Sequence, residues 1–234
     1  MRFTDSPLTG AKVVEIEARE DARGLFARTW CQQEFVAQGL SGEMVQSSIS
    51  RNLHRGTVRG MHLQLPPSRE AKLVRCTRGS IYDVIVDLRP GSKTFLWHFG
   101  IELTERNHTA LYIPPLMAHG FQTLEDDSEV LYQMSDFYAP QLAFGLRWDD
   151  AALGIRWPIG EGITILPRDA DYPDFDSRAF VDRVAALGAG SGKRRPCAGW
   201  SSPVAREAHN LEVLGSNPSP ATSQSPGVII ISGL

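Results

Sequence analysis

Residues Lys72–Leu88 read KLVRCTRGSIYDVIVDL, and this stretch decides the fold class. It holds two runs rich in β-branched residues, Lys72–Thr77 and Ile81–Leu88, which are typical of β-strands. Arg78-Gly79-Ser80 lies between them and is a turn signal. The stretch therefore predicts two short strands joined by a tight turn.

Similar short runs recur through the first 170 residues and predict further strands. Only Gln32–Gly39 has a helical pattern there, so a parallel α/β sheet, which needs helices between its strands, is disfavoured. Many short strands with polar turns predict an all-β sandwich, jelly roll or barrel. The other predicted strands are Lys12–Glu17, Gly24–Trp30, Glu43–Ser50, Thr57–Gln64, Phe95–Leu103, Thr109–Ile113, Gly120–Leu124 and Glu129–Tyr138.

The strand Ile81–Leu88 carries two acidic residues on one face. Side chains alternate along a strand, so Asp83, Ile85 and Asp87 share a face and the residues between them share the other. We expect one or two of these carboxylates to point into the interior of the fold. The alternative for Asp87 is simple solvation near the strand end.

The composition is that of an ordinary globular protein. Of the 234 residues, 42% are hydrophobic and 22% charged, and the net charge of -3 gives no field that favours nucleic acid or an anionic membrane. The 3 cysteines are far apart and odd in number, so neither a disulfide framework nor a cysteine zinc site is indicated. No signal peptide or membrane span is apparent, and we expect a cytoplasmic protein.

The chain changes character near residue 180. We predict one catalytic domain over 1–180 and a flexible, non-catalytic tail over 181–234, with a basic Gly-rich linker at 188–196. The stretch Ala208–Pro218 looks like a translated transfer-RNA gene, since Gly215–Pro218 can be encoded by the usual T-loop sequence. Read-through past a lost stop codon is therefore one hypothesis for the tail, and an ordinary disordered tail is the other. The codons at Gly215–Pro218 decide between them.

Several residues in these strands could carry chemistry. His62 follows Arg59, His119 precedes a glycine that permits close approach, and Tyr132 is a phenol inside an apolar strand. Each also has a structural explanation, such as core packing with a satisfied hydroxyl for Tyr132. Cations in nearby strand segments suggest an anionic ligand, and these are Arg55, Arg59, Lys72 and Arg75.

Taken in order, these segments resemble the dTDP-4-dehydrorhamnose 3,5-epimerase family over roughly residues 8–172. The resemblance implies a cupin-type jelly-roll barrel with a few short helices, and a homodimer. It also implies an isomerase of dTDP-rhamnose and polysaccharide biosynthesis that works without a metal or another cofactor. The segments are Asp21–Phe26, Arg59–Gln64, Ala71–Arg75, Asp83–Arg89, Ala118–Phe121, Tyr132–Pro140, Gly145–Asp150, Ile155–Pro158 and Leu166–Asp169.

The resemblance implies four catalytic residues for proton transfer beside the 4-keto group of a nucleotide-linked 6-deoxy sugar. His62 would be the base, with Asp169 fixing its tautomer. Lys72 would stabilise the enolate anion at O4. Tyr132 would be the acid on the opposite face of the sugar ring, because a phenol stays protonated near pH 7.

The resemblance also implies a set of substrate-binding residues, of which Arg23, Phe26 and Arg28 would come from a partner subunit. Arg28, Ser48, Ala143 and Arg168 depart from the usual family pattern, so a CDP- or GDP-linked sugar is an alternative to a dTDP-linked one. The substrate-binding set is Arg23, Phe26, Arg28, Gln46, Ser48, Arg59, Asp83, His119, Tyr138 and Arg168.

Three alternatives to 3,5-epimerisation stay open. The first is epimerisation at C3 or C5 alone, or ketoisomerisation. The second is a metal-binding cupin, in which His62, His119 and a carboxylate would bind the ion, although Gln64 interrupts the usual His-x-His motif. The third is a protein that only binds sugar nucleotides.

Strict alternation along the strand would put the Arg59 and His62 side chains on opposite faces, unless Gly60 forms a bulge.

Overall fold

A computed structural model describes residues 1–189 of this chain. The hypotheses for residues 190–234, including read-through at Ala208–Pro218, lie outside the described residues.

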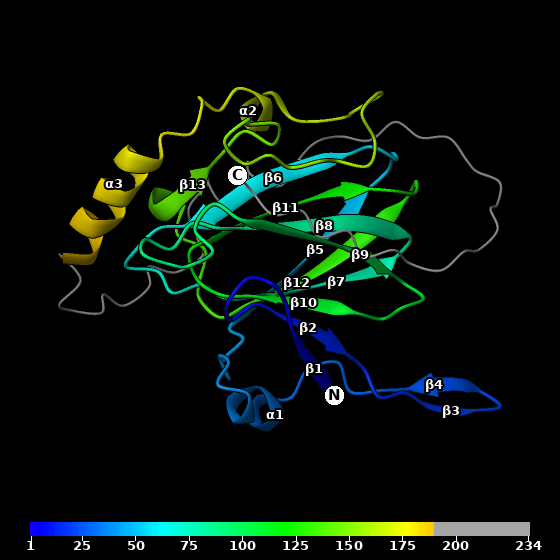
Figure 1. The fold of residues 1–234 in the computed structure, drawn as a ribbon. Helices are drawn as coiled ribbons and strands as arrows, with labels where there is room; N and C mark the ends of the chain where they lie inside the picture. The colour runs from blue at the N-terminus through cyan, green and yellow to red at the C-terminus, as the bar shows by residue number, and fades with distance from the viewer. Residues whose placement is uncertain (190–234) are drawn as a thin grey trace.

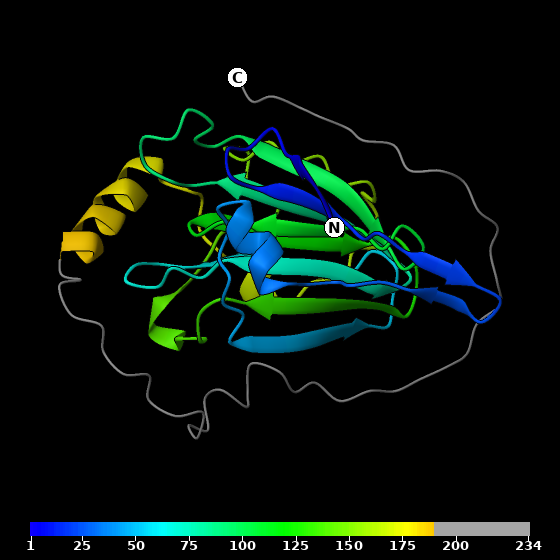
Figure 2. The ribbon, with the colours of Figure 1, turned by 90° about the horizontal axis from the view of Figure 1, so that it is seen from below.

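The described strands form two antiparallel sheets that face each other (Figures 1 and 2). One sheet has the order β1 (Arg2–Asp5), β2 (Lys12–Glu15), β10 (Ala110–Ile113), β7 (Lys72–Arg78), β12 (Ser128–Met134), β5 (Gln46–Asn52). The other has the order β13 (Ala143–Gly145), β6 (Val58–Gln64), β11 (Met117–Thr123), β8 (Ser80–Asp87), β9 (His98–Thr104). We call them sheet A and sheet D. Neighbouring strands are mostly not consecutive in the chain, as a jelly roll requires.

The remaining elements lie outside the two sheets. A hairpin of β3 (Arg19–Asp21) and β4 (Gly24–Phe26) projects away from them in both views (Figures 1 and 2). The helices are α1 (Gln32–Ala37), the 3-10 helix η1 (Pro140–Leu142), α2 (Pro167–Ala170) and α3 (Ser177–Ala189). Within residues 1–189 no helix has the length and apolarity needed to cross a bilayer.

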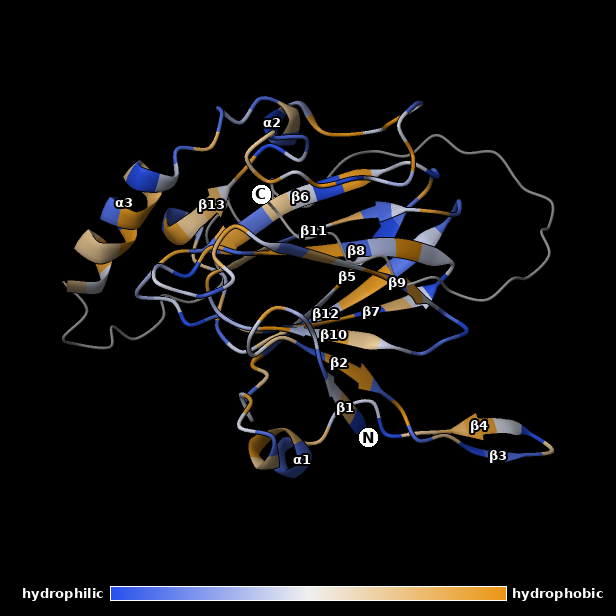
Figure 3. Ribbon diagram, viewed as in Figure 1, coloured by the Kyte–Doolittle hydropathy of each residue, from blue (hydrophilic) through white to orange (hydrophobic). Residues whose placement is uncertain are grey.

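The central core lies between the inner faces of the two sheets. Val74 of β7 and Val130 of β12 pack there with Ile85 of β8 and Phe121 of β11. Burial of apolar surface is the main stabilising term, so this contact holds the two sheets together. Figure 3 shows the corresponding apolar colour on the central strands.

Two further clusters cover the outer faces of the sheets. The C-terminal segment packs Phe180 and Val184 of α3 against the outer face of sheet D. Helix α1 packs Phe35 against Leu73 and Tyr112 on the outer face of sheet A. Both faces of the central strands are therefore buried over much of their length.

The all-β fold class is confirmed, and so is the alternation in β8. Asp83 and Asp87 are both 0% exposed, so the alternative of a solvated Asp87 is wrong and both carboxylates point inward. Asp87 instead accepts hydrogen bonds from the Arg89 guanidinium and from the hydroxyls of Ser92 and Thr94. That set of donors compensates the burial of its carboxylate.

Several element ends differ from those predicted. Helix α3 extends past residue 180, where the domain was predicted to end, because Val184 contributes an apolar side chain to the second cluster. Strand β4 ends at Phe26, short of the predicted end at Trp30, since in the described part of the chain it pairs only with the short strand β3.

Candidate active site

His62 on β6 is paired with Asp169 of α2. Its Nε2 lies 3.0 Å from Asp169 Oδ1, and the Arg168 Nε lies 3.2 Å from the same oxygen. The Asp169 side chain is 2% exposed, whereas that of His62 is 38% exposed. Burial alone would raise the pKa of Asp169, but the hydrogen bond from His62 and the positive charge of Arg168 outweigh it and lower the pKa. An ionised carboxylate therefore holds an accessible imidazole.

A bulge in β6 brings Arg59 and His62 to one face. His62 pairs with His119 and Arg59 pairs with Phe121, so Gly60 and Met61 together stand opposite a single residue of β11. Since His119 and Phe121 are two positions apart, Arg59 and His62 both point inward. The bulge alternative for Gly60 is therefore confirmed.

Gly60 has to be a glycine in this bulge. Its φ is +125°, and a Cβ there would lie 2.6 Å from the Gly120 Cα and 2.8 Å from the His119 carbonyl oxygen. The two strands can approach this closely only without that side chain.

A second histidine–aspartate pair lies deeper. His119 Nε2 is 2.7 Å from Asp83 Oδ1, and both residues are buried. Burial raises the pKa of Asp83 although His119 opposes the shift, and Asp83 Oδ2 has no hydrogen-bond partner among the described residues. Asp83 belongs to the predicted substrate-binding set; among residues 1–189 its buried carboxylate is hydrogen-bonded to His119, so we expect it to act by orienting that imidazole.

Tyr132 of β12 meets His119 across the space between the sheets. The two ring centroids are 5.8 Å apart at an interplanar angle of 77°. Burial raises the pKa of Tyr132, and the negative charge of Asp83 adds to this while Arg59 opposes it. The phenol is therefore protonated at neutral pH and able to donate. Ser48 of β5 stands directly opposite Tyr132 in the ladder of sheet A.

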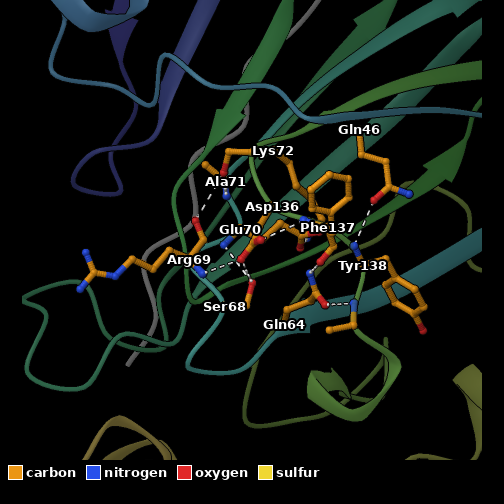
Figure 4. Close-up of polar contacts among 12 residues, drawn as sticks. Gln46, Gln64, Ser68, Arg69, Glu70, Ala71, Lys72, Asp136, Phe137 and Tyr138 are labelled. Atoms are coloured by element: carbon orange, nitrogen blue, oxygen red, sulfur yellow. Dashed lines mark hydrogen bonds and ion pairs between the residues drawn. The ribbon is translucent and has the colours of Figure 1, made fainter. Parts of the chain in front are cut away.

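Lys72 also lies on the inner face of sheet A, since it alternates with Val74, but its ammonium has an anionic partner. Its Nζ is 2.5 Å from Glu70 Oε2, and the side chains are 15% and 6% exposed (Figure 4). Sequence reasoning did not identify Glu70. The ion pair fixes the ammonium on the inner side of β7.

The predicted cation cluster is only partly present. Arg59 points inward, and its Nε donates to Asn52 Oδ1 at 2.7 Å. Arg75 instead lies on the outer face of sheet A, where it donates to the carbonyls of Thr29 and His108 and where burial lowers its pKa to about 10. It has no carboxylate partner among residues 1–189. The sequence pattern could not distinguish the two faces.

Arg23, Phe26 and Arg28 have no described contact with His62 within residues 1–189 of this chain. Arg23 pairs with Asp21, and Phe26 is 77% exposed. Arg28 pairs with Glu34 at 2.8 Å beside a hollow that Phe26 also lines. Arg23 and Phe26 are thus exposed on the hairpin, whereas Arg28 follows it and is bonded to Glu34 of α1.

The structure adds Tyr172, which sequence reasoning missed. Its ring contacts that of His62 edge to face, with centroids 6.5 Å apart. It also lies against Gly145, where any Cβ would overlap the ring. Gly145 is the cross-strand partner of His62, so Tyr172 forms a wall beside the imidazole. Its position three residues after Asp169 was the only available signal.

Fold and site together define a jelly-roll enzyme of the acid–base type. A held imidazole, a protonated phenol and an ammonium come from β6, β12 and β7, which belong to the two facing sheets. The described residues contain no group of three or more His, Cys, Asp or Glu side chains arranged to bind a metal ion.

Comparison with known proteins identifies the family. A family model described as dTDP-4-dehydrorhamnose 3,5-epimerase matches residues 5–177. An enzyme of that name from Sinorhizobium fredii is 36% identical over 173 residues, covering 74% of this chain and 89% of the relative. This chain belongs to the dTDP-4-dehydrorhamnose 3,5-epimerase family.

Solved structures agree with this assignment. The dTDP-4-dehydrorhamnose 3,5-epimerase of Bacillus anthracis, with TDP and PPi bound, is 34% identical with a TM-score of 0.71, over 74% of this chain and 99% of its own. A 3'-monoepimerase from Streptomyces bikiniensis, in complex with dTDP-quinovose, is 31% identical with a TM-score of 0.68, over 78% of this chain and 90% of its own. The cupin-type jelly-roll fold is therefore confirmed.

Proposed function

We propose that this chain is a cytoplasmic epimerase that inverts C3 and C5 of dTDP-4-dehydro-6-deoxyglucose, with His62 as the base and Tyr132 as the acid. The observation that carries this is the position of the His62–Asp169 pair on one sheet and of the Tyr132 phenol on the other. A base and an acid on facing sheets can serve opposite faces of a sugar ring that lies between them.

The proton balance follows from these groups. His62 removes the proton from the carbon beside the ketone, and the electron pair moves to O4 as an enolate. Lys72 stabilises that anion, for which it must turn from Glu70 toward the sugar. Tyr132 gives a proton to the opposite face of the carbon as the electron pair on O4 returns and the C4 carbonyl re-forms. The imidazolium then releases its proton and the tyrosinate takes one up, directly or through solvent. No net proton is gained or lost.

A nucleotide-linked substrate is supported by the ligands of related structures and by the arginines of this chain. The Bacillus anthracis structure contains TDP and the Streptomyces bikiniensis structure contains dTDP-quinovose. Arg59 and Arg168 flank the His62 site, and a planar guanidinium suits phosphate oxygens. Arg28 stays the residue to examine for nucleobase choice.

We further propose a homodimer in which the hairpin of one subunit completes the site of the other. Arg23 and Phe26 are 89% and 77% exposed, and within residues 1–189 the strands β3 and β4 pair only with each other. An exposed phenylalanine beside an arginine is suited to a base and its phosphates.

The test is incubation with dTDP-4-keto-6-deoxyglucose in deuterium oxide. We expect deuterium at both C3 and C5, and His62→Asn should reduce exchange at both by about 10²–10⁴-fold. Unchanged exchange in His62→Asn would remove His62 as the base. Calorimetry with dTDP, CDP and GDP gives the nucleotide preference in parallel.

A second candidate is epimerisation at C3 alone. It is favoured by the similarity to the Streptomyces bikiniensis 3'-monoepimerase. In the same experiment it predicts deuterium at C3 and none at C5.

A further inference from the structure

Gln64 lies two positions beyond His62 on β6, and both its amide nitrogen and its amide oxygen are hydrogen-bonded. It is 5% exposed. Its Nε2 donates to the Phe137 carbonyl at 3.2 Å, and its Oε1 accepts from the Ala139 N–H at 2.7 Å (Figure 4). The Gln64 amide therefore makes the pair of hydrogen bonds that a neighbouring strand would otherwise make with the segment that follows β12.

This geometry determines the position of Tyr138. In an extended chain, the carbonyl of the preceding residue and the N–H of the following residue point to one side of the chain, and the residue's own N–H points to the opposite side. For Tyr138, Gln64 lies on the side of the preceding carbonyl and the following N–H. On the second side, the Tyr138 N–H donates to Gln46 Oε1 at 3.0 Å. Two glutamine amides on different sheets thus hold one backbone unit from both sides.

The start of the segment is tied down as well. Asp136 accepts from the Ser68 hydroxyl at 2.9 Å and from the Arg69 N–H at 3.3 Å, and it caps the Phe137 N–H at 2.9 Å (Figure 4). The aromatic side chains that this segment carries nevertheless remain open, since Phe137 is 48% exposed and Tyr138 is 44% exposed. The backbone of this segment is held in place while its two rings are exposed. The rings are therefore positioned to contact a molecule outside the protein core.

We propose that Gln64 is a positioning residue that, with Gln46, fixes Tyr138 at the edge of the active site and so determines the affinity for the nucleotide-linked substrate. It acts through the loop and takes no part in proton transfer. This inference rests on the proposed function and deepens it. It also reassigns Gln46, which holds the loop through its carbonyl oxygen.

The test compares Gln64→Met with a matched control, Gln122→Met. Gln122 is equally buried, and its amide clamps both backbone groups of Ile159, in a loop that carries none of the proposed site residues. Both variants keep the side-chain length and lose two hydrogen bonds. We expect Gln64→Met to raise KM about tenfold with kcat changed less than about twofold. Gln122→Met should lower Tm to a similar degree and leave KM unchanged.

A double-mutant cycle with Tyr138→Ala tests the route of the effect. If Gln64 acts through Tyr138, then Gln64→Met adds nothing to KM in the Tyr138→Ala background. Full multiplication of the two effects, or an unchanged KM in Gln64→Met, would overturn the proposal. Should Gln64→Met not fold, Gln64→Glu keeps the acceptor for Ala139 and lacks the donor for Phe137, and the same KM increase is expected.

Two measurements separate this inference from the proposed function. A wild-type chain without deuterium exchange would end the proposed function. Backbone hydrogen exchange of residues 137–139 judges the clamp independently, because these amides should exchange faster in Gln64→Met than in Gln122→Met. Equal exchange rates in the two variants would show that Gln64 does not hold the loop.

Discussion

At the scale of single residues, the tautomer of His62 decides which nitrogen can act as the base. Asp169 is ionised because its pKa is lowered, so it can only accept, and Nε2 of His62 must donate to it. In the neutral imidazole the other nitrogen, Nδ1, then carries the lone pair. Sequence reasoning identified the pair through resemblance, and the structure adds which nitrogen is available.

We expect Asp169→Asn to reduce kcat by about 10²–10⁴-fold with little loss of stability. The amide can donate to Nε2 and favour the wrong tautomer, while it retains the shape of the carboxylate. Deuterium exchange at C3 and C5 at saturating substrate measures the effect, with Arg168→Gln as a comparison that removes another group bonded to Asp169 and leaves the His62 pair. A nearly normal rate in Asp169→Asn would mean that the tautomer is set by another group.

Asp83 should produce a pH dependence of stability. Its pKa is raised in the folded state, so between the ordinary aspartate pKa and that raised value the folded chain binds more protons than the unfolded chain. The free energy of unfolding therefore falls as pH rises through this window. We expect Asp83→Asn to flatten the dependence above about pH 4 and to be at least as stable as wild type at pH 7. Urea unfolding at several pH values measures both, and a strongly destabilised variant would indicate an ionised Asp83 paired with a protonated His119.

At the scale of elements, the bulge in β6 sets the direction of two site side chains, which strict alternation would place on opposite faces. It moves Arg59 and His62 to the same face of one strand, beside His119 on β11. The mechanism therefore depends on Gly60, which makes no hydrogen bond to substrate in the proposed chemistry.

We expect Gly60→Ala to destabilise the fold by about 2–4 kcal/mol and to abolish activity, because it combines backbone strain with crowding. Gly24→Ala is a matched control, since Gly24 has the same φ of +125° and nothing within 4 Å of its added Cβ. The difference between the two variants in thermal unfolding isolates the crowding against Gly120. A Gly60→Ala variant as stable as Gly24→Ala would show that β6 and β11 can separate.

At the scale of the whole molecule, the proposed homodimer predicts that each site uses residues of both subunits. A hybrid dimer of one His62→Asn chain and one Arg23→Ala chain, purified through two tags, has one site with both intact residues. We expect it to show about half of the wild-type activity, although each parent homodimer is nearly inactive. A hybrid no more active than its parents would show that each site is built within one chain.

The fold class followed from local pattern, whereas the roles of the site residues came from the resemblance to a known family. Period-two alternation predicts the strand Ile81–Leu88 and its inward carboxylates, because side-chain direction in a strand is a local property. The same rule fails for Arg59 and His62, because a bulge shifts the count by one residue. Alternation places Lys72 and Arg75 on opposite faces of one strand. It does not tell which face is the inner one, because that depends on where the second sheet packs.

The sequence alone determined the strands and the turns between them, since these depend on neighbouring residues, and through the family resemblance it pointed to His62, Lys72 and Tyr132. The tertiary structure alone decided the Glu70 partner of Lys72, the wall made by Tyr172 and the two-sided hold on Tyr138. The physical reason is distance along the chain. A hydrogen bond or ring contact between residues many positions apart exists only after the two sheets have packed, and no local pattern encodes it.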